Sequence, residues 1–457
     1  MSTHFMRSGR ARMRVLVTAL IASGIVVGGV LPASANPDAI PPDLLSEGTV
    51  VSSELRFFPA NEVGATGDTG ARSGARPSLE QLRQEDRDAT ATYQSDYGPP
   101  QVTAQDWSPP PFEYDYITSA YECQDHADQA GSADGWIKNH YAFCRIMKGE
   151  KGDRVCAGSI CFVVKSSFRV TILGFGSERD RAVRFVTFVD QIVSNTPALK
   201  EATFLKLDLE CTPLVNGDEC TEDPQNPTES EKSLAEWERV PAYFTRFTST
   251  APALTPENPN RLGYMDFWSR ATARVVGIPG SKPQSQDSPP QKVRYDSVNY
   301  LNLNGHNGAI FSRVKAVIHF PVSRPEFAAM TESAAHYRLA MQSPQLTIPR
   351  IDGKTIPGAV EGEALTRWYF NNTNQNRTEA VKACVAEWGA GYAEGGKYQC
   401  DEYPFNATHQ GAARGDGRFS VARVPGPDNE AAGRWLGAWY SYDRILDSDA
   451  FHVNATP

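Results

Sequence analysis

The sequence lacks several patterns that would assign it to a known class at once. After residue 31, no apolar run is long enough to cross a bilayer as a helix. No C-x-x-C pair and no cysteine–histidine spacing of the zinc-binding kind is present, which argues against structural zinc. A G-x-S-x-G turn and a Walker-type phosphate loop are also missing, so serine-hydrolase and nucleotide-hydrolase functions have no support.

An excess of positive charge is missing as well, because the formal net charge is -9. A protein that holds nucleic acid by charge alone needs the opposite sign, so a tight DNA-binding module is disfavoured. A hydrolase that acts on nucleic acid is not excluded, since a bound metal ion supplies local positive charge. Arginines also crowd the C-terminal segment: Arg414, Arg418, Arg423, Arg434 and Arg444.

The N-terminal segment has the three parts of an export signal. Arginines between residues 7 and 14 precede an uncharged run over residues 15–31, and Ala33-Ser34-Ala35 forms a small-residue cleavage site. We expect residues 1–35 to be a signal peptide and the mature protein to be secreted by the general secretory route, with no stable membrane association after cleavage. The alternative is an uncleaved anchor helix, which the glycines of the run and Pro32 disfavour.

Eight cysteines all lie in the mature part of the chain. An even number of cysteines in an exported chain indicates disulfide bonds. The sequence does not determine the pairing, but we expect each cysteine to bond its nearest neighbour along the chain. A bond from Cys384 to Cys400 would be the most useful, because it would brace the acidic segment that begins there. The cysteines are Cys123, Cys144, Cys156, Cys161, Cys211, Cys220, Cys384 and Cys400.

Composition divides the mature chain into regions. Residues 36–111 are rich in proline, glycine and serine and are expected to be a disordered linker, within which residues 50–58 could form a strand without an evident partner. Residues 112–325 alternate branched or aromatic residues with polar ones, which predicts a β-rich, sandwich-like domain. Residues 135–140 are expected to form a short helix or loop in it. The predicted strands are residues 160–173, 183–192, 202–209, 242–247, 271–276 and 309–320.

Helical patterns follow the β-rich region. Residues 323–342, around Pro325, and residues 378–388 predict two helices. The segment 326–379 is therefore expected to be a helical connector that leads to a small C-terminal domain at residues 380–457.

That C-terminal domain predicts strand, strand, helix and strand. Residues 397–403 and 419–424 form the first two strands, and residues 451–453 form the last. Asp428 or Asn429 is expected to cap the helix, since a short oxygen-bearing side chain satisfies amides of the first turn. Apolar residues recur at helical steps and form its buried stripe: Ala432, Trp435, Leu436 and Trp439. The predicted fold class is α+β.

Four pieces of this region arrive together in one order. They are residues 400–405 (Cys-Asp-Glu-Tyr-Pro-Phe), Gly411, a Pro-x-x-Asp-Asn run with Gly433 behind it, and a closing Asp-x-Phe-x-Val at residues 449–453. The segment resembles the NucA/NucB family of secreted deoxyribonucleases over about residues 380–457. The resemblance implies a ββα-metal-like fold, in which a strand carries the base and the helix carries the metal ligands.

Hydrolysis of a phosphodiester needs a deprotonated water, a cation against the developing negative charge and a stabilised leaving oxygen. The resemblance implies that Asp401 is the base. Glu402 must point to the opposite face of a regular strand, so one of the two carboxylates is expected to be catalytic and the other a supporting partner or bound by an arginine.

The remaining expected roles belong to the metal and the phosphate. Asn429 is the expected metal ligand, helped by Asp428 or Glu430, and plain helix capping would explain Asp428 or Asn429 alone as well. The expected cation is Mg²⁺ or Mn²⁺. Arg423 or Arg434 is expected to steady the scissile phosphate.

Some positions depart from the family pattern. Gln410 stands before Gly411 where an acidic residue is often found, His409 stands where tyrosine or glutamate is expected, and Trp439 replaces a polar residue of the helix. The alternative is therefore an extracellular binding protein with a β-sandwich module and an inactive nuclease-like domain. If the protein instead attacks competing cells, an inhibitor (immunity) protein is an expected partner besides DNA.

Overall fold

The computed structural model describes residues 47–62, 75–92, 116–225, 229–301, 306–321 and 325–455. All of them belong to one compact unit, Ile40–Pro457. The predicted signal peptide and much of the predicted linker lie outside the described residues. No helix of the described residues is long and apolar enough to span a membrane.

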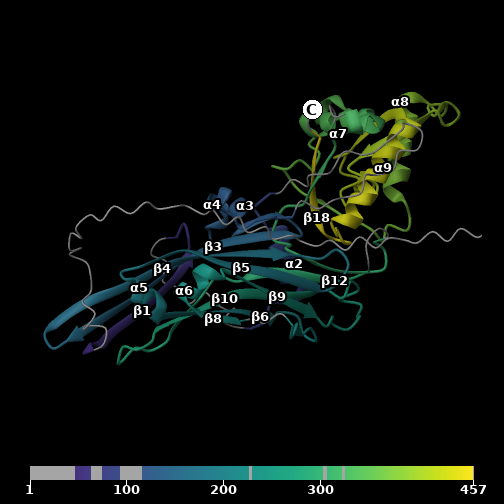
Figure 1. Ribbon diagram of the computed structural model, residues 1–457. Coiled ribbons are helices and arrows are strands. Elements are labelled where there is room, and N and C mark those ends of the chain that lie inside the picture. Colours follow the sequence, from purple (N-terminus) through teal and green to yellow (C-terminus); the bar gives the residue numbers. More distant parts are fainter. Residues whose placement is uncertain are drawn as a thin grey trace, which may run out of the picture. The chain divides into compact units, whose positions relative to one another are not determined.

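Long alternating segments form the first sheet, which is antiparallel throughout (Figure 1). The strand order is β1-β3-β4-β5-β9-β7, with β2 paired to β3. The tight turn between β3 and β4 contains Gly158 with a φ of 59°, a left-handed backbone that glycine adopts without strain. The strands are β1 (Thr49–Pro59), β2 (Trp136–Asn139), β3 (Ala142–Ala157), β4 (Ile160–Phe175), β5 (Ala182–Ser194), β7 (Cys220–Glu222) and β9 (Ala242–Ser249).

A second antiparallel sheet has the order β13-β12-β10-β6-β8, with β11 paired to β10. Its strands are β6 (Thr203–Pro213), β8 (Glu229–Ser233), β10 (Gly263–Val275), β11 (Gln284–Asp287), β12 (Gln291–Ser297) and β13 (Asn307–Ile310). Short helices lie along the chain before and between the strands: α2 (Leu79–Arg87), α3 (Ala120–Asp125), α4 (Ala127–Ala130), α5 (Pro197–Ala202) and α6 (Leu234–Arg239).

The two sheets share one apolar core. Phe185 of β5 and Phe247 of β9 each have their ring centroid 5.2 Å from that of Phe267 on β10, and all three rings are buried. Aromatic rings that meet at this spacing fill the space between facing sheets efficiently. The prediction of a β-rich region is therefore confirmed as two sheets packed on a common core, and strand β1, from the segment predicted as a disordered linker, also belongs to them.

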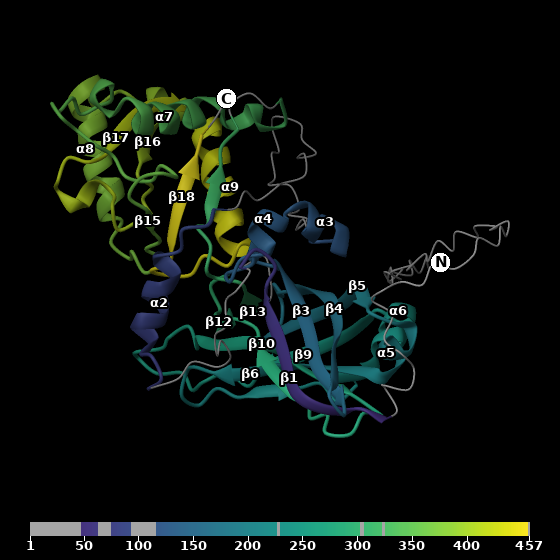
Figure 2. The ribbon, with the colours of Figure 1, turned by 90° about the vertical axis from the view of Figure 1, so that its left-hand side faces the viewer.

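The C-terminal region mixes helices with short strands (Figure 2). Strands β14 and β15 flank β18, which runs parallel to β14 and antiparallel to β15, whereas β16 and β17 form a separate hairpin. The elements are β14 (Val317–His319), η1 (Pro325–Met330), α7 (Thr331–Gln342), η2 (Pro344–Leu346), β15 (Leu365–Thr366), α8 (Gln375–Trp388), η3 (Glu394–Gly396), β16 (Tyr398–Tyr403), η4 (Ala412–Arg414), β17 (Ser420–Pro425), α9 (Gly426–Tyr442) and β18 (Ala450–Asn454).

Several element predictions were wrong in part. Residues 135–140 contribute strand β2 rather than a helix or loop, because Trp136 and Ile137 pair with β3. The predicted strand 309–320 is divided between β13 and β14, which belong to different sheets. The strand expected at residues 50–58 forms as β1 and does have a partner, β3, although that partner lies far along the chain. Helix α2, which begins with a capping box of Ser78 and Gln81, was not predicted.

The disulfide pairing follows the nearest-neighbour expectation. The four bonds are Cys123–Cys144, Cys156–Cys161, Cys211–Cys220 and Cys384–Cys400. The first three fasten elements of the β-rich region, and the fourth joins α8 to β16. No free cysteine is found among the described residues.

The turn between α9 and β18 is anchored on the second sheet by buried charges. Arg444 is fully buried and donates from Nε to Asp296 Oδ2 of β12 at 2.9 Å, with a second bond from Nη2 to Oδ1. Arg294 of β12 donates to Asp449 at 2.7 Å. Gly308 of β13 leaves room for this contact, since a Cβ there would lie 1.9 Å from Arg444 Nε.

Candidate active site on strand β16

Strand β16 carries its acidic residues on opposite faces. It pairs antiparallel with β17, so that Asp401 faces Ala422 and Glu402 faces Val421 in the register. Side chains alternate along a strand, and the contacts follow this rule: Asp401 meets α7, whereas Cys400 and Glu402 meet α8. Figure 2 shows the hairpin beside these two helices. The expectation that the two carboxyl groups do not share one face is confirmed.

Asp401 lies in a closed polar cluster, with 3% of its surface exposed. His336 Nδ1 lies 2.8 Å from Oδ2, and the Tyr337 hydroxyl donates to Oδ1 at 3.1 Å. Burial, and next the charge of Asp401, raise the pKa of Tyr337 well above its usual value, so the phenol remains a donor. Both oxygens of Asp401 are thus occupied by side chains of α7.

The cluster continues from His336 to β17. His336 Nε2 lies 2.7 Å from Ser420 Oγ, so that serine, histidine and aspartate follow one another as in a nucleophilic triad. Ser420 is fully buried and His336 is 6% exposed. A nucleophile must reach the substrate, so this arrangement works as an internal brace between α7, β16 and β17 rather than as a triad.

Glu402 lies on the more open face of the strand. Its side chain is 11% exposed and forms an ion pair with Arg377 of α8, whose side chain is 33% exposed. Burial raises the pKa of Glu402 to about 7, with Arg377 opposing the rise and Asp401 adding to it. Glu402 is therefore a carboxyl group whose pKa burial raises, beside the positive charge of Arg377.

Asn376, next to Arg377 on α8, shapes the loop that follows β16. Its Nδ2 donates to Asn406 O at 2.9 Å and to Thr408 O at 2.8 Å, while its Oδ1 accepts from Ala413 N at 3.0 Å. Gly411 allows this close approach, since a Cβ there would lie 2.3 Å from the Asn376 amide. Gly411, the loop glycine of the sequence motif, is therefore explained by packing, because a side chain at this position would collide with Asn376.

The predicted metal ligand Asp428 is engaged within the fold. Its two oxygens accept from the backbone amides of Glu332 at 3.0 Å and Ser333 at 2.9 Å, at the first turn of α7. Burial raises the pKa of Asp428, and those same amides oppose the rise. Helix α9 begins at Gly426 with Pro425 at its N-cap, so the prediction that Asp428 or Asn429 caps this helix was wrong. Asp428 caps α7 instead.

The other two predicted ligands, Asn429 and Glu430, meet at Gln399. Asn429 Nδ2 donates to Gln399 Oε1 at 2.9 Å, and Gln399 Nε2 donates to Glu430 Oε1 at 2.8 Å. Gln399 lies two residues before Asp401 and on the same face of β16. Across the described part of the chain, no group of three or more histidine, cysteine, aspartate or glutamate side chains is arranged to hold a metal ion.

The predicted phosphate-binding arginines have other partners. Arg423 donates to Tyr392 O at 2.8 Å, pairs with Glu394 and lies 3.9 Å above the Tyr398 ring. Arg434 lies 3.9 Å from Glu430 on the same helix. The guanidinium beside an acidic residue of β16 belongs to Arg377.

No sequence pattern pointed to a functional role of Arg377, Asn376, His336 or Tyr337. All four lie in segments predicted as a helical connector, and no spacing links them to residues 400–405. At Gln410, which departs from the family pattern, the side chain accepts from Thr366 N at 2.9 Å and donates to Thr366 Oγ1 at 3.1 Å. Gln410 therefore ties the loop to β15.

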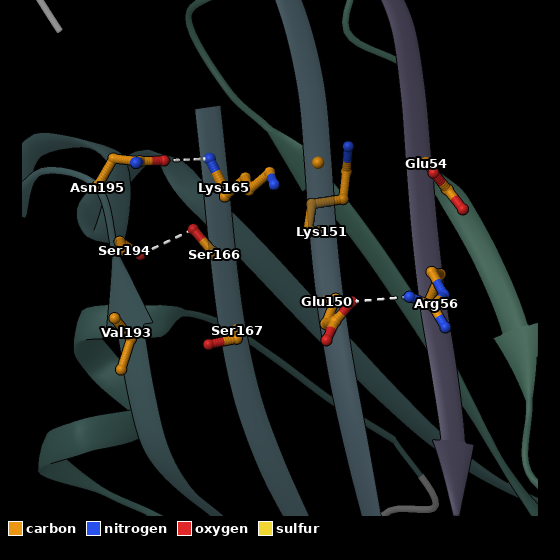
Figure 3. Close-up of a pocket in the computed structure, with 11 residues that line it drawn as sticks. Glu54, Arg56, Glu150, Lys151, Lys165, Ser166, Ser167, Val193, Ser194 and Asn195 are labelled. Carbon is orange, nitrogen blue, oxygen red and sulfur yellow. Dashed lines mark hydrogen bonds and ion pairs between the residues drawn. The ribbon is translucent and has the colours of Figure 1, made fainter. Parts of the chain in front are cut away.

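A groove of about 470 Å³ also lies on the first sheet, across β1, β3, β4 and β5 (Figure 3). Its lining is polar and carries both signs of charge, with an ion pair of Arg56 and Glu150 at 3.1 Å and a hydroxyl contact of Ser166 and Ser194 at 2.7 Å. A binding role of the β-rich region would have this groove available.

In the C-terminal region a hairpin thus presents a carboxyl group of raised pKa beside an arginine, an arrangement suited to acid–base chemistry on an anionic substrate. Residues 361–454 match the family model described as Deoxyribonuclease NucA/NucB. The predicted resemblance to this family is therefore confirmed for the C-terminal segment, and it begins about twenty residues earlier than expected. No curated protein matches the chain.

Proposed function

We propose that this protein is a secreted nuclease that hydrolyses the phosphodiester bonds of DNA at strand β16. The observation that carries the proposal is Glu402: a carboxyl group of pKa about 7, paired with Arg377, inside a segment that matches a deoxyribonuclease family. A general base works best when its pKa lies near the working pH.

Glu402 is a better base than Asp401 for a geometric reason. A base must contact the water that it deprotonates, and Asp401 has both oxygens bonded to buried side chains of α7. Glu402 is more exposed and has one oxygen bound by Arg377. In this proposal Glu402 takes a proton from water while the water oxygen forms a bond to phosphorus. The P–O ester bond breaks, and the leaving oxygen takes a proton from a solvent water and is released as a hydroxyl.

Arg377 supplies a planar cation at the same place. A guanidinium binds a phosphate through two parallel N–H groups, which both orients the phosphorus and offsets its charge. Asp401, held by His336 and Tyr337, has a positioning role because it fixes β16 against α7.

We also propose that cleavage uses Mg²⁺ or Mn²⁺. The predicted trio of ligands does not fit a protein-built cage, because Asp428 is committed to the N-terminus of α7. Mg²⁺ in phosphate chemistry is often held by only one or two protein oxygens, with water and the substrate phosphate completing its shell. Asn429 and Glu430 meet at Gln399 on the face of β16 opposite Glu402, so they do not fit a cation that acts together with Glu402 and Arg377. A cation at the scissile phosphate would stabilise its negative charge, whichever protein oxygen holds it.

A DNA-containing gel run with and without chelator tests the function. Clearing by the wild-type protein that chelator removes is the expected result, and no clearing in either gel would refute the nuclease. Glu402→Gln should lower the cleavage rate by about a hundredfold or more with folding intact. Glu387→Gln, an acidic position of α8 that pairs with Arg350, serves as the matched control. If Glu402→Gln keeps full cleavage activity and Asp401→Asn loses it, the general base is Asp401 and not Glu402.

Secretion and partners are tested separately. N-terminal sequencing of the exported protein should find Asn36 as the first residue, since the cleavage site follows Ala35. An inhibitor protein is proposed only for the case in which the nuclease attacks other cells. A protein that co-purifies with it and blocks its clearing of DNA would support that case.

The alternative role, binding by the β-rich region, has the polar groove of Figure 3 in its favour. It predicts no clearing of DNA at all. The gel experiment therefore separates the two functions directly.

A further inference from the structure

The loop after β15 places three aromatic residues in a row, Trp368, Tyr369 and Phe370. Tyr369 is 42% exposed and Phe370 is 49% exposed, and Trp368 is half-buried. Large apolar rings in water are costly when they are contiguous, so such a run on a surface indicates a contact site.

Hydrogen bonds tie this loop to the segment behind Glu402. Trp368 N donates to Ala407 O at 2.8 Å, and Asn371 Nδ2 donates to Asn406 O at 3.0 Å. Asn406 in turn accepts from the backbone amide of Arg377 at 3.0 Å. These bonds link the aromatic loop, through Asn406, to the backbone of Arg377.

Each ring of the loop is held by another aromatic ring. Trp368 and the exposed His409 are stacked, with ring centroids 5.0 Å apart and planes inclined by 15°. Tyr369 is stacked on Tyr300, and Phe370 meets Tyr369 edge to face, which holds Phe370 in place. A ring that is already fixed loses little entropy when a ligand stacks on it.

We propose that Trp368, His409 and Phe370 form a stacking platform for unpaired bases of a DNA strand. This inference rests on the proposed function for its class of substrate. Bases within a duplex have their faces covered by neighbouring bases, whereas unpaired bases stack on aromatic side chains with little sequence preference. Stacking also suits a chain with a net charge of -9, which gains little from phosphate contacts alone. The enzyme should therefore prefer single-stranded DNA.

The test compares binding of three probes by fluorescence anisotropy: an oligothymidine strand, an abasic strand of equal length and a duplex. The protein is the full chain with Glu402→Gln, in chelator, and gel analysis verifies that the strands stay intact. The variant is Trp368→Leu with Phe370→Leu, which keeps apolar volume and removes the flat rings. Tyr121→Ala, at a 77% exposed aromatic of the β-rich region, is the control.

The leucine variant should bind oligothymidine about tenfold or more weakly, while its binding of the abasic strand and of the duplex changes by less than about twofold. Equal binding of oligothymidine by variant and control overturns the platform, as does an equal loss for the abasic strand. The outcome is separable from that of the nuclease assay. Selective loss of oligothymidine binding supports the platform even if the wild-type protein cuts no DNA. If the protein cuts DNA but the leucine variant binds oligothymidine as tightly as the control, the platform is refuted and the nuclease function is not.

Discussion

Glu402 and Asp401 are neighbours in the chain, yet their surroundings separate their chemistry. Asp401 is enclosed by His336 and Tyr337, and Glu402 faces Arg377 at the edge of solvent. Strand alternation made this separation predictable from the sequence. The partners were not predictable, because His336 and Tyr337 lie more than sixty residues before Asp401 and no local pattern connects them.

The pH dependence of cleavage should report Glu402. With a pKa of about 7, the base is protonated below that pH, so the rate should fall about tenfold for each pH unit below 7 and level off above it. A rate profile from pH 5 to 9 measures this. Glu402→Gln should remove the acidic limb together with the activity, and a profile that is flat through pH 6 would exclude Glu402 as the base.

Stability should change in the opposite direction over the same range. The folded-state pKa of Glu402 is raised from 4.5 to about 7, so the folded protein holds this proton more tightly than the unfolded chain. The favourable protonated state is fully present below about pH 4.5 and is lost as the pH rises through 7. This group alone should lower the free energy of unfolding by about 3 kcal/mol across that window. Urea titrations of wild type and Glu402→Gln at several pH values should show the difference.

At the scale of elements, the alternation of apolar and polar residues predicted most of the long strands. It did not predict the short strands or which strands pair with each other. β1 pairs with β3 across nearly one hundred residues, and β14 pairs with β18 from the other end of the domain. Such contacts depend on the closed tertiary structure and leave no trace in local periodicity. The helix after β17 was predicted, but its start was misplaced because Asp428 satisfies the amides of α7 rather than those of its own helix.

Asp428→Ala should therefore loosen α7. The substitution removes both acceptors from the first turn of α7, which should lower the free energy of unfolding by about 1–2 kcal/mol, and Asp428→Asn should cost less because it keeps one acceptor oxygen. The measurement is urea denaturation of chelator-treated protein, with the exposed Asp352→Ala as control. If Asp428 were instead a metal ligand, its removal would leave the chelated protein unchanged and would alter only the metal concentration needed for cleavage.

For the whole molecule, the region matched by the nuclease family is not self-contained. Its last turn sends Arg444 to Asp296 and Asp449 to Arg294, both on strand β12 of the β-rich region. The sequence predicted two successive domains from their different patterns, but it could not reveal this contact because single charged residues carry no periodic signal. The β-rich region therefore supports the C-terminal region through paired, buried charges.

Breaking one of these pairs should destabilise both regions together. Asp296→Ala leaves the Arg444 guanidinium buried without its carboxylate, and the loss of one partner of a buried pair costs about 3–5 kcal/mol. Asp134→Ala breaks an ion pair with Arg313 in which Asp134 is 80% exposed, and it should change stability by less than about 1 kcal/mol. Denaturation followed both by near-ultraviolet circular dichroism and by DNA cleavage should show the two signals falling at one lowered urea concentration in Asp296→Ala.

Exchange of both partners, Asp296→Leu with Arg444→Met, should recover part of the loss, because no unpaired charge then remains. If cleavage survives at urea concentrations where the dichroism is already lost, the two regions unfold independently. The ion pairs between them then contribute no stability.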